Sequence, residues 1–176
     1  THEKGYSQHR YLQALIKRIA EEKGFRAKVE QPILDGKGRV DVELEIDGKK
    51  IACEISVTSS PVQELANIKK CLQAGYKEVI LCSPKERNLK RVKSLVSKDL
   101  KDSDQAKILF LQPEELFSYL DDLTTLMFSK EKRIKGYKVK VQYQPLNEED
   151  KRARREAVAQ VIFQSLRRQK TSDAKR

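Results

Sequence analysis

The sequence lacks the features that mark membrane, secreted and zinc-binding proteins. No apolar run approaches the ~20 residues that a membrane-spanning helix needs, and the amino end has no hydrophobic segment of the secretory kind. Only two histidines are present, and the three cysteines at positions 53, 71 and 82 are too far apart for a Cys-x-x-Cys motif. We therefore expect no zinc site, no membrane contact, and three reduced core cysteines in a cytoplasmic protein.

Signatures of several catalytic classes are also absent. The sequence contains no Gly-rich phosphate loop, no zinc-peptidase motif, and no arrangement typical of Ser–His–Asp or Cys–His hydrolases. Charge, in contrast, is abundant: 36% of the residues are charged and 38% are apolar. This balance is typical of a globular protein with a heavily charged surface. The 176 residues suffice for one domain with a core and an appendage.

Positive charge is concentrated at the carboxyl end. Residues 130–176 contain 15 Lys and Arg against 6 Asp and Glu, so they carry +9 of the net charge of +11. Because neutralising phosphates releases counterions, nucleic acid is the commonest partner of such a basic segment. A solvated basic helix, or one that docks on an acidic protein surface, is the alternative interpretation.

Hydrophobic patterns predict an α/β domain over residues 1–123. Apolar residues at helical spacing follow Ser7, which we take as an N-cap, and alternating apolar residues flank an Asp47-Gly48 turn of the hairpin type. An antiparallel hairpin that runs into βα crossovers predicts a mixed sheet with helices on both faces. The expected strands are 26–33, 39–46, 49–57, 78–82 and 108–111, and the expected helices are 7–24, 61–75, 84–96 and 113–123.

Residues 124–176 are predicted to form a basic extension to this domain. Apolar and polar residues alternate over residues 138–143, which favours a strand. An apolar stripe amid basic residues predicts a helix over residues 148–168. By charge, this helix carries the best candidates for nucleic-acid contact, which are Lys151, Arg152, Arg154, Arg155, Arg167 and Arg168. Few aromatic residues accompany them, so contact with the phosphate backbone is favoured over base reading.

Two carboxylates face each other in the predicted hairpin. If the turn has two residues, Asp41 lies directly opposite Glu54, with Cβ atoms about 4.5–5.5 Å apart. Both side chains are then expected on the face opposite to Val40 and Val42. Two close carboxylates suit a hard divalent cation, whose shell is completed by waters and a substrate phosphate.

A plainer interpretation of the same register is a surface pair neutralised by a basic neighbour. Arg39 is expected on the same face, next to Asp41 and opposite Ser56. Like charges placed opposite each other destabilise a sheet unless a cation lies between them. From the spacing alone, the metal site and the neutralised pair stand as equal alternatives.

The run Gly38-Arg39-Val40-Asp41, followed after the hairpin by Ile51-Ala52-Cys53-Glu54-Ile55-Ser56, resembles the core motif of the restriction-endonuclease-like, or PD-(D/E)XK, nucleases. In that family an Asp begins one strand and a Glu-x-Lys lies on the next, after an initial helix and before a crossover helix. The resemblance covers residues 7–123 and implies a restriction-endonuclease-like fold that hydrolyses phosphodiesters with Mg²⁺ or Mn²⁺. It also implies that Asp41, Glu54 and the backbone carbonyl of Ile55 bind the metal. In general texture the whole chain is similar to nuclease-like modules appended to helicases or ATPases of mobile elements.

Ser56 stands where the family has its lysine, and a hydroxyl supplies no positive charge. Lys69, beside the apolar stripe of the next helix, could reach back over the sheet as a migrated lysine. Arg39 could supply charge from the facing strand, although a guanidinium is a poor base. The third alternative is a degenerate site that binds nucleic acid without hydrolysing it. Lys69 also has a plainer interpretation as a surface lysine whose stem covers the stripe.

Three functions follow from these patterns. The leading hypothesis is a metal-dependent nuclease for DNA, with Asp41 and Glu54 on the metal and Lys69 or Arg39 in place of the missing lysine. The second is the same fold without hydrolysis, which holds DNA for a partner helicase or ATPase. The third is a protein-interaction domain whose basic helix docks on an acidic partner.

His9 on the first helix is a candidate for contacting phosphate or assisting a metal, or else an ordinary surface histidine. The sequence leaves homo-oligomer formation open.

Overall fold

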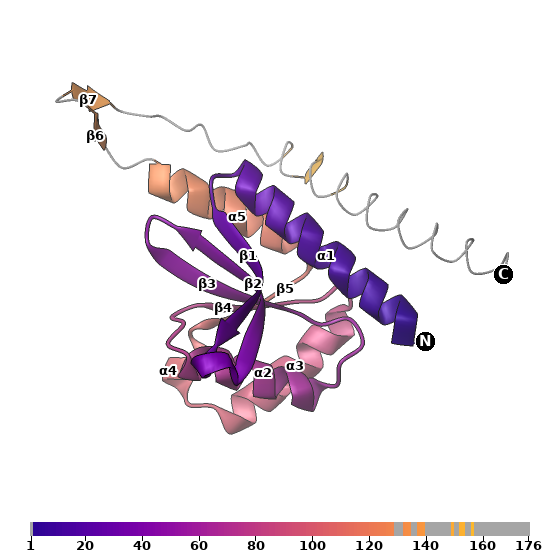
Figure 1. Ribbon diagram of the computed structural model, residues 1–176. Helices are drawn as coiled ribbons and strands as arrows, with labels where there is room; N and C mark the ends of the chain where they lie inside the picture. Colours follow the sequence, from indigo (N-terminus) through magenta and orange to yellow (C-terminus); the bar gives the residue numbers. More distant parts are fainter. Residues whose placement is uncertain are drawn as a thin grey trace, which may run out of the picture.

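The computed structural model describes residues 2–128, 132–134, 137–139, 149, 152–153 and 156. Within residues 2–128, the chain forms a five-stranded mixed sheet flanked by helices (Figure 1). The predicted α/β class, with helices on both faces of a mixed sheet, is therefore confirmed. No helix in this described part of the chain is long and apolar enough to cross a bilayer.

The sheet combines an antiparallel half with a parallel half. Its strands are β1 (Arg26–Ile33), β2 (Gly38–Ile46), β3 (Lys49–Ile55), β4 (Val79–Cys82) and β5 (Ile108–Leu111), in that spatial order. The β1–β2 and β2–β3 pairs are antiparallel, whereas β3–β4 and β4–β5 are parallel. The crossovers through helices are what place β4 and β5 parallel to β3.

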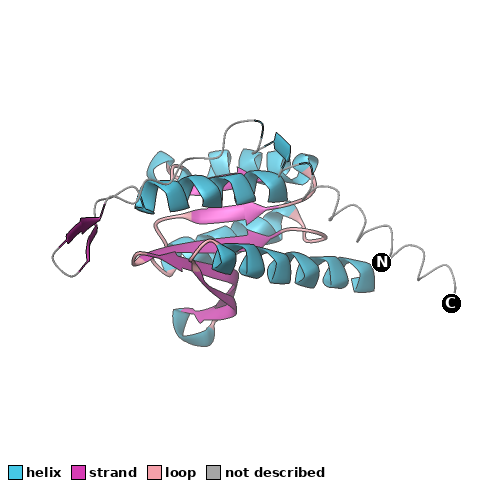
Figure 2. Cartoon of the chain, turned by 90° about the horizontal axis from the view of Figure 1, so that it is seen from above, coloured by secondary structure: helices cyan, strands magenta, loops and turns pink. Residues whose placement is uncertain are grey.

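Helices cover both faces of the sheet, as Figure 2 shows from above. The helices are α1 (His2–Glu22), α2 (Pro61–Gln73), α3 (Glu86–Asp99), the short α4 (Asp102–Gln105) and α5 (Pro113–Phe128), with a 3₁₀ turn η1 at Leu34–Gly36. On one face, α1 and α5 pack over a core that includes Leu12 and Leu120. On the other face, α2 and α3 pack over a core that includes Ile68 and Val92.

Two local signals in the sequence produce the expected structure. Asp47 and Gly48 have φ angles of 49° and 77°, the left-handed conformations that a two-residue hairpin turn of this kind requires. Ser60 caps α2. Its side chain accepts a hydrogen bond from the backbone N–H of Gln63, and the side chain of Gln63 accepts one from the backbone N–H of Ser60. The turn and the cap fix both ends of the segment that carries Glu54 and Ile55.

Two helices are longer than predicted. α1 begins at His2 rather than after Ser7, because a serine is a preferred cap and not a barrier to helix on its amino-terminal side. α5 continues past Leu123 to Phe128, and Met127 extends its apolar stripe against the core. Neither change alters the order of the strands.

The described part of the extension contains a small sheet of its own. β6 (Lys132–Ile134) and β7 (Tyr137–Val139) form an antiparallel pair. The predicted strand 138–143 overlaps β7, whereas β6 was not expected. Within the predicted helix 148–168, the described residues Glu149, Arg152, Ala153 and Glu156 are helical. The remainder of both predicted elements lies outside the described residues.

Candidate active site

A cleft of about 920 Å³ lies where α1, the first strands of the sheet and the amino end of α2 meet. Four of the predicted site residues line it, namely His9, Arg39, Asp41 and Ile55. Glu30 and Glu64 also line it, which adds acidic groups from β1 and α2. Glu54, Ser56 and Lys69 are not part of its wall.

The backbone departs from regular strand geometry at the cleft. The pairing of β2 with β3 ends at Val42 and Cys53. Beyond that point, Val40 packs in the core under α2 and α3, whereas Val42 packs in the core under α1 and α5. Residues two apart share a face in a regular strand, so the alternation is broken at Asp41 and the prediction that Val40 and Val42 share a face is wrong. Glu30, with φ of 51°, interrupts the β1–β2 pairing at the same level.

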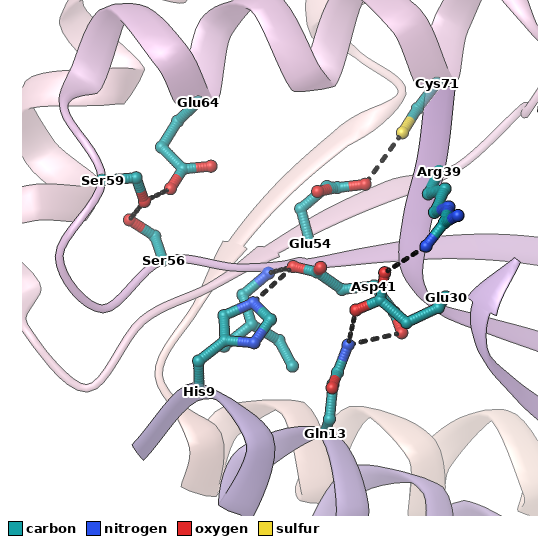
Figure 3. Close-up of polar contacts among 11 residues, drawn as sticks. His9, Gln13, Glu30, Arg39, Asp41, Glu54, Ser56, Ser59, Glu64 and Cys71 are labelled. Atoms are coloured by element: carbon teal, nitrogen blue, oxygen red, sulfur yellow. Dashed lines mark hydrogen bonds and ion pairs between the residues drawn. The ribbon is translucent and has the colours of Figure 1, made fainter. Parts of the chain in front are cut away.

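The Asp41 carboxylate lies where the two strands part. Its Oδ2 accepts a hydrogen bond of 2.7 Å from the backbone N–H of Ile55 (Figure 3). If the β2–β3 pairing continued, Ile55 would lie opposite Val40, and the Ile55 N–H would donate to the Val40 backbone carbonyl. The Asp41 carboxylate takes the place of that carbonyl as the acceptor. Gln13 supports the position by donating from Nε2 to the Asp41 backbone carbonyl at 3.2 Å and to the Glu30 carboxylate at 2.6 Å.

His9 from α1 completes the surroundings of Asp41. Its Nε2 lies 3.0 Å from Oδ2 of Asp41. This hydrogen bond raises the pKa of His9, and partial burial lowers it by less. A positively charged imidazole at neutral pH is therefore favoured more than for a free histidine.

Glu54 is a buried carboxyl group with weak partners. The side chain is 3% exposed, and its Oε1 accepts a hydrogen bond of 3.3 Å from the thiol of Cys71 on α2. Burial and, second, the charge of Asp41 raise the pKa of Glu54 to about 8. Within the described residues no Lys or Arg forms an ion pair with it. At neutral pH the group is consequently protonated unless a cation comes near.

The two carboxyl groups do not project side by side as predicted. Asp41 contacts His9 of α1, whereas Glu54 turns toward Cys71 of α2, as Figure 3 shows. They remain electrostatic neighbours, because the charge of Asp41 raises the pKa of Glu54 and the Asp41 backbone forms a hydrogen bond to it. The two side chains thus contact helices on opposite faces of the sheet.

Ser56, which occupies the lysine position, and Lys69, one of the two groups expected to replace that lysine, lie away from the cleft. Ser56 is fully buried and accepts a hydrogen bond from Asn88 of α3, so its hydroxyl has a structural partner. Lys69 forms an ion pair with Asp99 of α3. Arg39 alone lines the cleft, where it is 69% exposed and lies 3.9 Å from Glu30. It does not neutralise the Asp41–Glu54 pair.

Positive groups form the outer part of the cleft. Arg10, Lys17 and Arg39 line it together with the deeper carboxylates. Lys17 Nζ also binds Glu21 at 2.7 Å. On the extension, the predicted contact Arg152 is exposed and donates to Glu156 at 3.1 Å. The other predicted contacts, Lys151, Arg154, Arg155, Arg167 and Arg168, lie outside the described residues.

Several polar residues of the site are not visible from the sequence pattern. Glu64, 1% exposed on the first turn of α2, reads in the sequence as an ordinary acidic residue near a helix amino end. Cys71 reads as a core residue, and Asn88 as part of an exposed helix face. Only the three-dimensional packing of α2 and α3 against the end of β3 places them around Glu54 and Ser56.

Comparison with known proteins adds no identity. No family model matches the chain, and no curated protein is similar enough to count as a relative. Among the described residues, no three His, Cys, Asp or Glu side chains are grouped so that they could hold one metal ion.

Proposed function

We propose that the cleft binds a nucleic-acid phosphodiester, DNA in the first instance, and hydrolyses it with Mg²⁺ or Mn²⁺. The observation that carries this proposal is Glu54, a buried carboxyl group near a second carboxylate, with no Lys or Arg paired to it among the described residues. Burying a charge without a partner is costly. A divalent cation between Glu54 and Asp41 would lower the pKa of Glu54 and remove that cost.

The donors at this position fit a hard cation. Asp41, Glu54 and the backbone carbonyl of Ile55 offer oxygen ligands, which Mg²⁺ prefers, and Mg²⁺ keeps several waters when few protein ligands hold it. Two side chains and one carbonyl are also compatible with the absence of a group of three acidic, His or Cys side chains among the described residues. Bound there, the ion would supply charge stabilisation at the phosphate.

The chain's own residues then have separate tasks. Arg39, Arg10 and Lys17 bind the phosphate backbone at the cleft mouth, where their positive charge attracts the nucleic acid. His9 holds the Asp41 carboxylate in position through the 3.0 Å contact of its Nε2, and this hydrogen bond raises the pKa of His9. The basic extension adds contacts that are independent of sequence.

A second candidate function is a binding module that has lost hydrolysis. It is favoured by Ser56, which is buried in a structural contact, and by Lys69, which is paired with Asp99 away from the cleft. Without an ammonium group at this position, the same surface would hold DNA for a partner helicase or ATPase. The two candidates share the fold and the basic cleft and differ only in turnover.

Cleavage of supercoiled plasmid and of single-stranded oligonucleotide, with Mg²⁺ or Mn²⁺, tests the first proposal. We expect metal-dependent nicking that is lost in Asp41→Asn, while the protein still binds DNA. The matched control is Asp47→Asn, which removes an acid at the other end of the same hairpin. A wild-type protein that binds DNA with a steep salt dependence but never cleaves it would favour the binding module. No binding at low salt would leave only a protein-interaction role.

A further inference from the structure

We propose that Glu64 is the proton acceptor for the attacking water in this cleft, held in place by a buried chain of hydroxyl and amide groups. This inference rests on the proposed hydrolysis and assigns the role that Ser56 cannot perform. Glu64 lies on the first turn of α2, lines the cleft and is 1% exposed. It is thus a nearly buried carboxylate at the site of the reaction.

The burial of Glu64 has no compensating cation. Its carboxylate accepts a hydrogen bond from the Ser59 hydroxyl, and in the described part of the chain it forms no ion pair with Lys or Arg. The amino end of α2 offers a partial positive charge, but the charge of Glu64 also acts on Glu54 and raises its pKa. A carboxylate kept in this environment is unfavourable for stability alone, which indicates a chemical task.

A chain of polar contacts fixes the Glu64 carboxylate. Asn88 of α3 donates to the Ser56 hydroxyl, the Ser56 and Ser59 hydroxyls are 3.5 Å apart, and Ser59 donates to Glu64. Ser56 and Glu64 are both buried, so this chain has little competition from water. Residue 56, where the family resemblance places lysine, therefore acts through Ser59 as a positioning residue. Figure 3 shows Ser56, Ser59 and Glu64 in this sequence of contacts.

Geometry separates this role from that of a metal ligand. Glu64 lies on α2, where the Ser59 hydroxyl binds its carboxylate, whereas the proposed ligands Asp41, Glu54 and Ile55 lie on β2 and β3. Lys69 is paired with Asp99, and Arg39 stays protonated at any relevant pH, so neither accepts a proton. Of the two glutamates that line the cleft, Glu30 is held by Gln13 and lies 3.9 Å from Arg39. We therefore assign the step to Glu64, whose carboxylate accepts a hydrogen bond from the Ser59 hydroxyl.

The step balances without another reactant. As the water oxygen forms its bond to phosphorus, one water proton passes to the Glu64 carboxylate. The bond between phosphorus and the leaving oxygen breaks with its electron pair on that oxygen, which takes a proton from solvent. Glu64 then releases its proton to solvent, and the products are a phosphate monoester and an alcohol.

The decisive variant is Glu64→Gln, which keeps the volume and the acceptor for Ser59 but removes the base. We expect kcat for DNA cleavage to fall by about 10²–10⁴-fold, the usual contribution of general base catalysis, with KM for DNA and the Mn²⁺ affinity each changed less than twofold. Glu86→Gln is the matched control, since Glu86 is also a first-turn helix glutamate but is exposed and bound to Lys90. We expect that variant to cleave like the wild type.

Chemical rescue provides a readout that a structural role would not give. Glu64→Ala leaves space for a small carboxylate, and added formate is expected to restore at least a tenth of the lost rate, whereas chloride at equal ionic strength is not. For the positioning chain, Ser59→Ala is expected to lower kcat and Ser59→Thr to recover it, because only the latter keeps the hydroxyl.

The outcomes separate the two proposals. A wild-type protein without cleavage overturns the hydrolytic function and this assignment together. A wild type that cleaves and a Glu64→Gln variant that cleaves equally well overturn the assignment alone. A Glu64→Gln variant that loses Mn²⁺ binding also overturns it, since Glu64 would then be a ligand. Lost turnover with retained Mn²⁺ binding supports it.

Discussion

The buried glutamates at the two ends of the β2–β3 hairpin have different hydrogen-bond and ion-pair partners. Near the turn, the Glu43 carboxylate accepts a hydrogen bond from Tyr76 and lies 3.6 Å from Nζ of Lys50. At the open end, Glu54 has a thiol and a backbone amide as partners, and its pKa is raised to about 8. Among the described residues, the hairpin thus has a lysine partner for Glu43 near the turn and no Lys or Arg partner for Glu54 at the open end.

The difference teaches how a site can be distinguished from a scaffold. An acid that serves the fold is stabilised by its neighbours, because an uncompensated buried charge destabilises the native state. Glu54 forms no ion pair with Lys or Arg among the described residues, and it lies near the point where the pairing of β2 with β3 ends, beside the cleft. The following predictions test this contrast.

The largest expected effect is on catalysis. Glu54→Gln should lower the rate of metal-dependent DNA cleavage at least ~100-fold, the scale of losing one electrostatic contact in a transition state. The fold should persist, since an amide has the shape of the protonated carboxyl group. Glu43→Gln, the same substitution at the turn end, should leave cleavage intact. Plasmid nicking measures the cleavage rate of both variants, and circular dichroism measures their folding. An equal loss of cleavage in the two variants would contradict the difference between Glu54 and Glu43.

The second effect is a pH dependence of stability. The pKa of Glu54 is raised from 4.5 to about 8 in the folded state, so between these values the folded protein retains a proton that the unfolded chain has released. The free energy of unfolding should therefore fall as the pH rises from about 5 to 8, by an amount on the order of a few kcal/mol. Urea unfolding at several pH values gives the free energy of unfolding of the wild type and of Glu54→Gln. The contribution of Glu54 is the difference between the two slopes of this free energy against pH.

Divalent cations sharpen the same test. Mn²⁺ should reduce the wild-type slope between pH 5 and 8, because a bound cation favours the ionised form of Glu54. The Glu54→Gln variant should show no such change. Identical slopes in the two proteins without metal would mean that the burial of Glu54 does not disfavour its charge.

A smaller effect is expected at the turn end. Tyr76→Phe removes the hydroxyl that donates to the buried Glu43 carboxylate, and should lower the free energy of unfolding by about 1–3 kcal/mol. DNA cleavage per folded molecule should not change, because the site lies at the other end of the hairpin. Tyr11→Phe serves as the control in thermal unfolding. A loss of cleavage in Tyr76→Phe would link the two ends and weaken the contrast between them.

The smallest effect is on binding. Arg39→Ala should weaken DNA binding a few-fold and reduce the slope of log affinity against log salt by about 1, as expected for one phosphate contact. Lys28→Ala, an exposed position on β1 outside the cleft lining, is the control. Fluorescence anisotropy over a salt series measures both, and an unchanged slope in Arg39→Ala would remove this residue from the interface.

Much of the fold could be predicted from local sequence. Asp47-Gly48 specifies a two-residue turn, and the turn fixes the register down to the pairing of Val42 with Cys53. Pro61 after Ser60 marks the start of α2, and the short apolar strands between helices indicate the parallel half of the sheet. These signals act over a few residues, which is why periodicity and turn chemistry suffice.

The site was predicted only in part, because its geometry depends on distant contacts. Periodicity assigns Val40 and Val42 to one face, but the side chain of Asp41 binds the Ile55 amide and the strand alternation fails there. Lys69 lies away from the cleft because it forms an ion pair with Asp99 on α3, and spacing within α2 does not reveal that contact. No spacing rule shows that Glu64 is buried, since this depends on how α2 packs at the end of β3.

The central claim is that Asp41 and Glu54 hold one divalent cation at the gap between the strands. Crystals soaked in Mn²⁺ and measured for anomalous scattering test it most directly. The account predicts a single strong anomalous peak within bonding distance of both carboxylates and of the Ile55 carbonyl, absent from crystals of Asp41→Asn. Soaked wild-type crystals with no peak there, and with Glu54 still bound to Cys71, would contradict it.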